Sequence, residues 1–127
     1  MISEKIKKGV LQMTECKKYD IFYVDLGEPK GNIQSGVRPC IIFSNRVACE
    51  YSPILLVIPI TSQIKRSLPT HLTLRGVLPK ESTVLFEQVL TVNKSQLRER
   101  VGELPSKLKP RADEKLKISF GLVPEFA

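Results

Sequence analysis

The chain alternates short apolar segments with turn residues from Asp20 to Leu104. Apolar or alternating segments of this kind, bounded by Gly, Pro, Asn and Ser, are typical of β-strands. The pattern predicts strands over 20–25, 39–43, 54–60, 71–74, 82–90 and 100–104. Many short strands with little helix between them favour a small β-barrel that is closed or nearly closed.

The two ends of the chain have helical rather than strand periodicity. Residues 1–14 place apolar side chains at helical spacing between lysines, which predicts an amphipathic N-terminal helix. Its apolar positions are Ile2, Ile6, Val10 and Met13. Near the C-terminus every fourth residue is apolar, between a proline and a glycine, which predicts a helix over 108–120. Its apolar positions are Leu108, Ala112, Leu116 and Phe120.

Size and composition fit one compact domain. The 127 residues, 42% of them hydrophobic, suffice to bury a core without disulfides or structural metals. We expect a mainly β (α+β) fold, with residues 1–18 as a helical extension and residues 19–127 as the barrel domain. The cysteines are odd in number, which favours small core residues; they are Cys16, Cys40 and Cys49. The longest apolar run, Ile54–Ile58, is too short to cross a bilayer, and we expect a cytoplasmic protein.

The charge balance indicates an anionic partner. Twenty basic residues against 13 acidic ones give a net charge of +7. Residues 61–75 contain Lys65, Arg66 and Arg75 and no acidic residue, which favours one cationic face. Such a face suits a polyanion such as nucleic acid, although many small proteins are basic without any such partner.

The segment Gly31–Pro39 contains the best candidate for chemistry, Arg38. Glycines at 31 and 36 permit a tight, mobile loop, and Pro39 biases Arg38 toward an extended conformation at the start of a buried strand. A guanidinium on a rigid strand beside such a loop can grip two phosphate oxygens at once. The alternative is an arginine that pairs with a carboxylate at a strand end.

Two further polar groups adjoin apolar strands. Thr61, Ser62 and Gln63 follow the aliphatic strand directly, where a core strand reaches the surface. Glu87 and Gln88 interrupt an otherwise apolar segment. The alternatives are that Thr61 caps a backbone amide in a turn, and that Gln88 is a hydrogen-bonded core amide. The only histidine is His71 and no two cysteines have metal-ligand spacing, so we expect neither a metal site nor a two-histidine mechanism.

Taken in this order, these segments resemble the MazF/PemK (also Kid) toxins of prokaryotic toxin–antitoxin pairs. The resemblance runs from about residue 18 to residue 122. Its motifs are the opening strand Tyr19–Leu26, Gln34–Pro39, Ser44-Asn45, Ile60–Gln63, Leu68–His71, Glu87–Val89 and the C-terminal helix. The family fold is an SH3-like barrel, shared with the gyrase poison CcdB.

The resemblance implies a dimeric, metal-independent, sequence-specific endoribonuclease that needs no cofactor. Arg38 and Thr61 would be its catalytic pair, and the RNA's own 2′-hydroxyl would attack, leaving a 2′,3′-cyclic phosphate and a 5′-hydroxyl. The implied contacts to single-stranded RNA are Lys30, Gly31, Asn32, Gln34, Asn45, Ser62, Gln63, Lys65 and Gln88. The implied partners are a second copy of the chain and an acidic, MazE-like antitoxin, with DNA bound only through that antitoxin and no membrane.

The sequence departs from the family pattern in the loop, where Ile33 replaces a common glutamate, and at Leu90, where a basic residue is frequent. The N-terminal extension also lies outside the usual domain. Two other functions remain alternatives at this point: a gyrase-poisoning toxin on the same fold, and a non-catalytic RNA-binding barrel.

Overall fold

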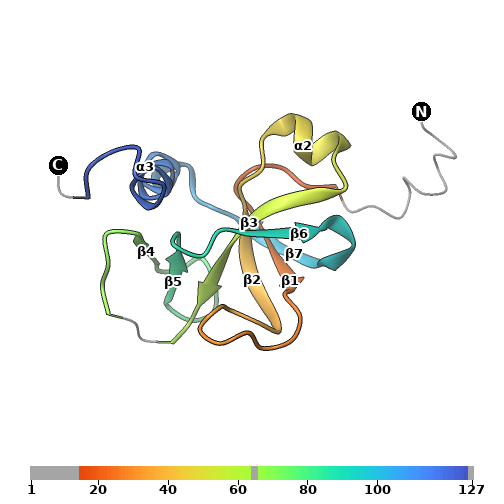
Figure 1. Cartoon of the computed structure of the whole chain (residues 1–127), viewed down its shortest axis with the longest axis horizontal. Coiled ribbons are helices and arrows are strands. Elements are labelled where there is room, and N and C mark those ends of the chain that lie inside the picture. The colour runs from red at the N-terminus through yellow and green to blue at the C-terminus, as the bar shows by residue number, and fades with distance from the viewer. Residues whose placement is uncertain (1–14, 64–65, 126–127) are drawn as a thin grey trace, which may run out of the picture.

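The computed structural model describes residues 15–63 and 66–125 as one seven-stranded antiparallel sheet with two α-helices (Figure 1). The hydrogen-bonded order is β4-β5-β3-β2-β1-β7, and β6 also pairs with β3. The strands are β1 (Asp20–Asp25), β2 (Val37–Ile42), β3 (Ile54–Thr61), β4 (His71–Leu74), β5 (Ser82–Leu85), β6 (Leu90–Asn93) and β7 (Leu97–Glu103). The bounds of β1 and β4 agree with the prediction. In the described part of the chain, no helix is both long and apolar enough to cross a membrane.

The predicted single strand over 82–90 is wrong, because this segment contributes to two strands separated by a turn. The N–H of Gln88 donates to the carbonyl of Leu85 at 3.0 Å and closes that turn. Both strands then pair with β3, at opposite ends: β6 with Ile54–Val57 and β5 with residues 60 and 61. The polar pair Glu87-Gln88 therefore marks the break between two strands rather than an interruption within one.

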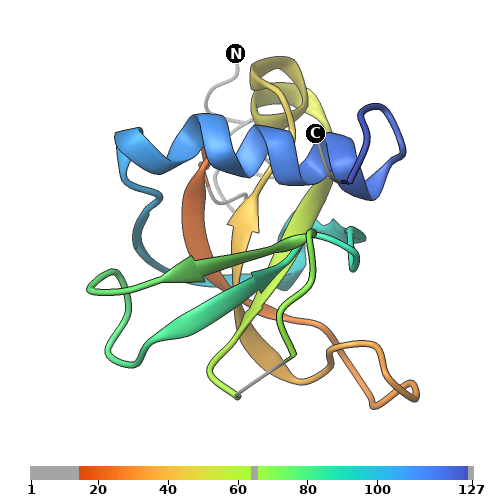
Figure 2. The ribbon, with the colours of Figure 1, turned by 90° about the vertical axis from the view of Figure 1, so that its left-hand side faces the viewer.

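The sheet is not closed, so the predicted barrel, closed or nearly closed, is not confirmed. Among the described residues, no ladder joins β4 at one edge to β7 at the other. The chain that follows β7 runs back across this opening as a short 3₁₀ helix, η2 (Ser106–Leu108), and then α3 (Lys109–Ser119). Figure 2 shows α3 lying across the strands. The buried side chains of Leu104 and Ala112 share a core cluster with Leu72 and Leu74 of β4, so side-chain packing covers an edge that hydrogen bonds leave open.

Two apolar clusters fill the interior on opposite faces of β1 and β2. Phe22 and Val24 belong to one cluster and Ile21 to the other, as period-two alternation along a strand requires. Both faces are buried, which explains the nearly continuous apolar runs in the sequence. The expectation that the cysteines are core residues is confirmed, because all three are buried and free; they are Cys16, Cys40 and Cys49.

The C-terminal helix is confirmed, with α3 beginning one residue after Leu108. The short helix α2 (Arg46–Tyr51) was not predicted, because Cys49 is its only buried residue and it has no apolar stripe. The remaining strand bounds differ slightly: β2 and β7 begin earlier than predicted, since pairing with β1 includes residues that lack a strand-like pattern. The predicted N-terminal helix, in residues 1–14, lies outside the described residues, and the last part of the predicted helical extension, residues 15–18, is not helical.

Candidate active site

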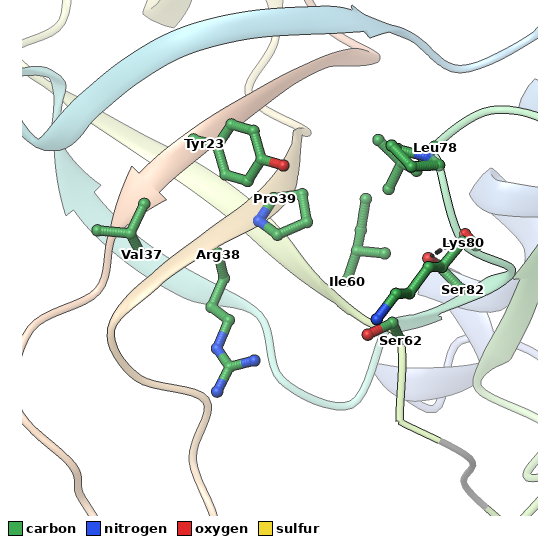
Figure 3. A pocket seen from close by; sticks show the side chains of 10 residues that line it. Tyr23, Val37, Arg38, Pro39, Ile60, Ser62, Leu78, Lys80 and Ser82 are labelled. Atoms are coloured by element: carbon green, nitrogen blue, oxygen red, sulfur yellow. Dashed lines mark hydrogen bonds between the residues drawn. The ribbon is translucent and has the colours of Figure 1, made fainter.

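A pocket of about 300 Å³ opens at the end of the sheet where β2 begins and β3 ends (Figure 3). In Figures 1 and 2 the β1–β2 loop and the C-terminal end of β3 lie at this same end of the molecule. Residues from the four strands β1, β2, β3 and β5, from the position directly after β3 and from the β4–β5 turn form the wall of the pocket. They are Tyr23, Val37, Arg38, Pro39, Ile60, Ser62, Leu78, Pro79, Lys80 and Ser82.

The pocket forms because strands β2 and β3 diverge at this end of the sheet. Their ladder runs from Ile42↔Val57 to Cys40↔Pro59 and stops there. Pro39 lacks the N–H that would extend it, and the end of β3 pairs with β5 instead. Continuing the same register by two residues would set Arg38 opposite Thr61, so the two predicted catalytic residues lie on neighbouring strands where those strands diverge.

Arg38 is half-buried in the wall of the pocket. Its Nε donates to the carbonyl oxygen of Ser35 at 2.8 Å, which fixes the guanidinium against the β1–β2 loop. Its terminal nitrogens, which are hydrogen-bond donors, point away from Tyr23 and Pro39 in Figure 3. None of the carboxylates in residues 15–63 and 66–125 forms an ion pair with Arg38. The positive charge at the pocket is therefore uncompensated by the described residues, unlike that of an ordinary strand-end arginine.

Thr61 occupies a different environment. It is only 2% exposed and does not line the pocket, although its neighbours Ile60 and Ser62 do. Its hydroxyl oxygen accepts a hydrogen bond from the N–H of Gln63 at 3.1 Å, which is the turn-capping arrangement considered from the sequence. The hydroxyl proton is still free to be donated, since this bond uses only an oxygen lone pair.

Gln88 holds the β1–β2 loop through both ends of its amide. Its Oε1 accepts from the backbone N–H of Gln34 at 2.8 Å, and its Nε2 donates to the carbonyl oxygen of Asn32 at 3.2 Å. The loop turns at Gly31, whose φ of 63° favours glycine, and Lys30 forms an isolated β-bridge with Ile33. The amide of Gln88 thus substitutes for the partner strand that this part of the loop lacks.

A second polar cluster lies directly beside Gln88. Glu87 accepts hydrogen bonds from the Thr70 hydroxyl at 2.8 Å and pairs with Nε2 of His71 at 3.0 Å. Desolvation raises the pKa of Glu87, but the hydrogen bonds from His71, from the Glu87 backbone and from Thr70 outweigh it, so the pKa lies below its usual value. The side chain of His71 is only 8% exposed. This cluster fixes the turn that carries Gln88.

The other predicted contact residues are spread over the molecule. Asn45 caps α2 by accepting from the N–H of Ala48 at 2.9 Å, beyond the far end of β2 from Arg38. Lys65 lies outside the described residues. Lys30, Ser62 and Gln63 are exposed. The structure therefore brings Gln88 together with the loop, and Arg38 together with Ser62, but it does not bring Asn45 to the pocket.

The thiol nearest to Arg38 is not a nucleophile. Burial raises the pKa of Cys40 to about 12, although the charge of Arg38 lowers it. A thiolate, not a thiol, attacks phosphorus or carbon, so Cys40 is inert near neutral pH. Its role is to fill the core, as the sequence indicated.

Tyr23 and Lys80 also line the pocket, although neither was predicted as a site residue. Tyr23 was assigned only to a strand, although its position between the core residues Phe22 and Val24 places it on the opposite face. Lys80 lies in a turn and carries no local signal beyond its charge. Of the two departures from the family pattern, Ile33 is 46% exposed at the loop and Leu90 packs against a core cluster.

Comparisons with known proteins agree with this architecture. Residues 17–120 match the family described as PemK-like, MazF-like toxin of type II toxin-antitoxin system. The chain is similar to Endoribonuclease EndoA of Bacillus subtilis (strain 168), with 33% identity over 111 residues, covering 84% of this chain and 96% of that protein.

Solved structures with low sequence identity share the fold. MazF (Form-I) from Deinococcus radiodurans aligns with a TM-score of 0.74 at 21% identity, covering 85% of this chain and 98% of that one. An endoribonuclease in complex with its cognate antitoxin, from Mycobacterial species, aligns with a TM-score of 0.73 at 20% identity, covering 85% and 97%. With the family match spanning the whole sheet and the C-terminal helix, the chain belongs to the PemK-like, MazF-like toxins of type II toxin–antitoxin systems.

Proposed function

We propose that this protein is the toxin of a toxin–antitoxin pair and an endoribonuclease that cleaves single-stranded RNA at specific sequences without a metal ion. One observation carries the proposal: Arg38, whose charge no described carboxylate neutralises, is fixed by the Ser35 carbonyl in the wall of a pocket between two diverging strands. Family membership and the similarity to an endoribonuclease support the same conclusion.

The proposed reaction uses the substrate's own nucleophile. The 2′-hydroxyl oxygen attacks the adjacent phosphorus and gives up its proton to solvent water, and the bond from phosphorus to the 5′-oxygen breaks. The products are a 2′,3′-cyclic phosphate and a 5′-hydroxyl, whose oxygen gains a proton. The protein therefore has to orient the RNA backbone and to stabilise the charge that develops on the phosphorane oxygens.

Arg38 is suited to charge stabilisation rather than to proton abstraction. A guanidinium has a pKa above about 12 and is a poor base near neutral pH, whereas its planar fork binds two phosphate oxygens at once. We assign it to the non-bridging oxygens, with late proton donation to the leaving 5′-oxygen. Thr61 would donate its hydroxyl proton to the same phosphate, and because Thr61 is almost fully buried, this role requires a small local adjustment at the end of β3.

The remaining contacts and partners follow from the same proposal. The loop 30–34, Ser62, Gln63, Lys65 and Gln88 would contact unstacked bases and phosphates, as amides and cations do in single-stranded RNA recognition. A homodimer and an acidic antitoxin would be the protein partners in the cytoplasm. A disordered acidic segment that folds on binding would fit a cationic cleft of this kind.

The direct test incubates purified protein with RNA in the presence of a chelator and sequences the fragment ends. We expect cyclic-phosphate and 5′-hydroxyl ends at a short recurring motif. Arg38→Ala should lower the cleavage rate by about a hundredfold to a thousandfold, the typical effect of losing one preorganised donor. Arg46→Ala is the matched control, because Arg46 is an exposed helix residue paired with Glu50 at 3.3 Å.

Three outcomes would reject the assignment. Near wild-type cleavage by Arg38→Ala would show that this guanidinium does not act on the phosphate. Salt-sensitive RNA binding without any cleavage would identify a non-catalytic RNA-binding protein. Inhibition of gyrase supercoiling without RNA cleavage would identify a gyrase poison on the same fold.

A further inference from the structure

Tyr23 gives the pocket a flat apolar wall. The residue faces Pro39 across the β1–β2 ladder, while its neighbours Phe22 and Val24 are buried on the opposite face. Tyr23 is half-buried, and its ring and Pro39 both border the pocket in Figure 3. An accessible aromatic face beside a proline ring is the kind of surface on which nucleic-acid bases stack.

Lys80 supplies a second cation on the other side of the pocket from Arg38. It lies in the β4–β5 turn, where the hydroxyl of Ser82 donates to the Lys80 carbonyl oxygen at 2.8 Å and fixes the backbone. The adjacent acid, Glu81, pairs with Arg75 at 3.3 Å instead. Within the described residues Lys80 has no carboxylate partner, and Figure 3 shows its side chain extending toward Ser62.

The dimensions suit one nucleotide. A volume of about 300 Å³ lies at the small end of the range for ligand pockets in proteins. Tyr23, Arg38 and Lys80 border the same pocket, so a base against Tyr23 would leave its flanking phosphates toward the side on which Arg38 and Lys80 lie. The same arrangement would not suit a purely apolar ligand, because two uncompensated charges border the pocket.

We propose that Tyr23 and Lys80 form a nucleotide subsite next to the scissile phosphate. One base of the single-stranded RNA stacks on Tyr23 and Pro39, Lys80 and Ser62 bind the phosphate of that nucleotide, and Arg38 holds the phosphate that is cleaved. This inference rests on the proposed function, and it adds residues that bind substrate without taking part in the reaction.

Binding is measured with an RNA oligonucleotide of the cleaved sequence that carries a 2′-deoxy sugar at the cleavage position, so that it cannot react. Tyr23→Leu should weaken binding by about fivefold to a hundredfold, the usual effect of removing one stacking platform. Tyr23→Phe retains the ring and should bind within about twofold of the wild type. Loss of affinity in Tyr23→Phe as large as in Tyr23→Leu would overturn the stacking role.

Salt dependence tests Lys80 independently of folding, because the residue is exposed in a turn. Lys80→Gln should reduce the slope of log affinity against log salt by about 0.7, the value for one phosphate contact on a single strand. Lys117→Gln, an exposed lysine on α3, is the control and should leave the slope unchanged. An unchanged slope in Lys80→Gln would overturn the phosphate contact.

The two proposals fail in different ways. If Arg38→Ala abolishes cleavage while Tyr23→Leu and Lys80→Gln bind the oligonucleotide like the wild type, the subsite is wrong and the endoribonuclease assignment stands. If the wild-type protein neither binds nor cleaves RNA, both are wrong.

Discussion

Gln88 connects two distant parts of the chain, and removing its amide should release the β1–β2 loop. Gln88→Ala deletes the hydrogen bonds to the Gln34 N–H and the Asn32 carbonyl, at 2.8 and 3.2 Å. One hydrogen bond contributes about 0.5–1.5 kcal/mol net, so losing both should lower the stability of the ordered loop, relative to the open loop, by about 1–3 kcal/mol. The population of the open loop should then rise by roughly fivefold to a hundredfold, since 1.4 kcal/mol is about tenfold.

Opening of the loop also affects Arg38, through one hydrogen bond. The Ser35 carbonyl that accepts from Nε of Arg38 belongs to the same loop, so the guanidinium loses its fixed orientation when the loop opens. We expect kcat/KM for RNA cleavage to fall about tenfold, less than in Arg38→Ala. The core should be unaffected, because no core residue contributes to the Gln88 bonds.

Native-state hydrogen exchange measures the loop directly. The amide of Gln34 should exchange faster in Gln88→Ala by the same factor as the open population, while the amide of Ile41 in β2 should keep its wild-type rate. Gln88→Glu keeps the acceptor for Gln34 but loses the donor to Asn32. Its Gln34 amide should exchange at a rate between those of the wild type and Gln88→Ala. Equal exchange at Gln34 in the wild type and Gln88→Ala would refute the clamp.

Three further predictions concern stability. Gln34 carries a buried Oε1 with no hydrogen-bond partner among the described residues. Gln34→Met should therefore raise the free energy of unfolding by about 1 kcal/mol in a denaturation experiment and weaken RNA binding measured by fluorescence anisotropy. A lower free energy of unfolding in Gln34→Met would contradict this. Desolvation raises the pKa of Glu87, but its hydrogen bonds, chiefly that from His71, together lower it more. The contribution of ionised Glu87 to the folded state is therefore complete above pH 4.5 and is lost as the pH falls through the lower pKa of the folded protein. Glu87→Gln should abolish this acid dependence of the free energy of unfolding. Burial and the hydrogen bond to Asp113 raise the pKa of Tyr19 to about 12. The contribution of the protonated Tyr19 hydroxyl to the free energy of unfolding is therefore complete below pH 10 and is lost as the pH rises through about 12. If Tyr19→Phe unfolds at alkaline pH like the wild type, this prediction is wrong.

Part of the site follows from family membership rather than from pattern. The glycine loop and the proline predict only that Arg38 stands at the start of a strand, and the structure agrees. The assignment of Arg38 and Thr61 to one phosphate came from the resemblance. Both residues stay predicted catalytic residues: β2 and β3 carry them to the same end of the sheet, and the structure buries Thr61.

The pattern of apolar and polar residues along the sequence was enough to locate the strands and the helix that have a clear periodicity. Period-two and continuous apolar runs located β1 and β4 to the residue and most of β3, and the fourfold spacing located α3. The buried cysteines and the turn-capping form of Thr61 were also foreseeable, because both depend on immediate neighbours. These features need only the preferences of a short segment for one conformation.

Tertiary structure decided everything that joins distant segments. β3 pairs with β6 at one end and β5 at the other, α3 covers an edge that hydrogen bonds leave open, and Gln88 clamps a loop more than fifty residues away in the sequence. The pocket arises where β2 and β3 diverge and collects Tyr23 and Lys80 from elements far apart in the chain. Pairing of this kind depends on which surfaces meet in three dimensions, and no local periodicity encodes that choice.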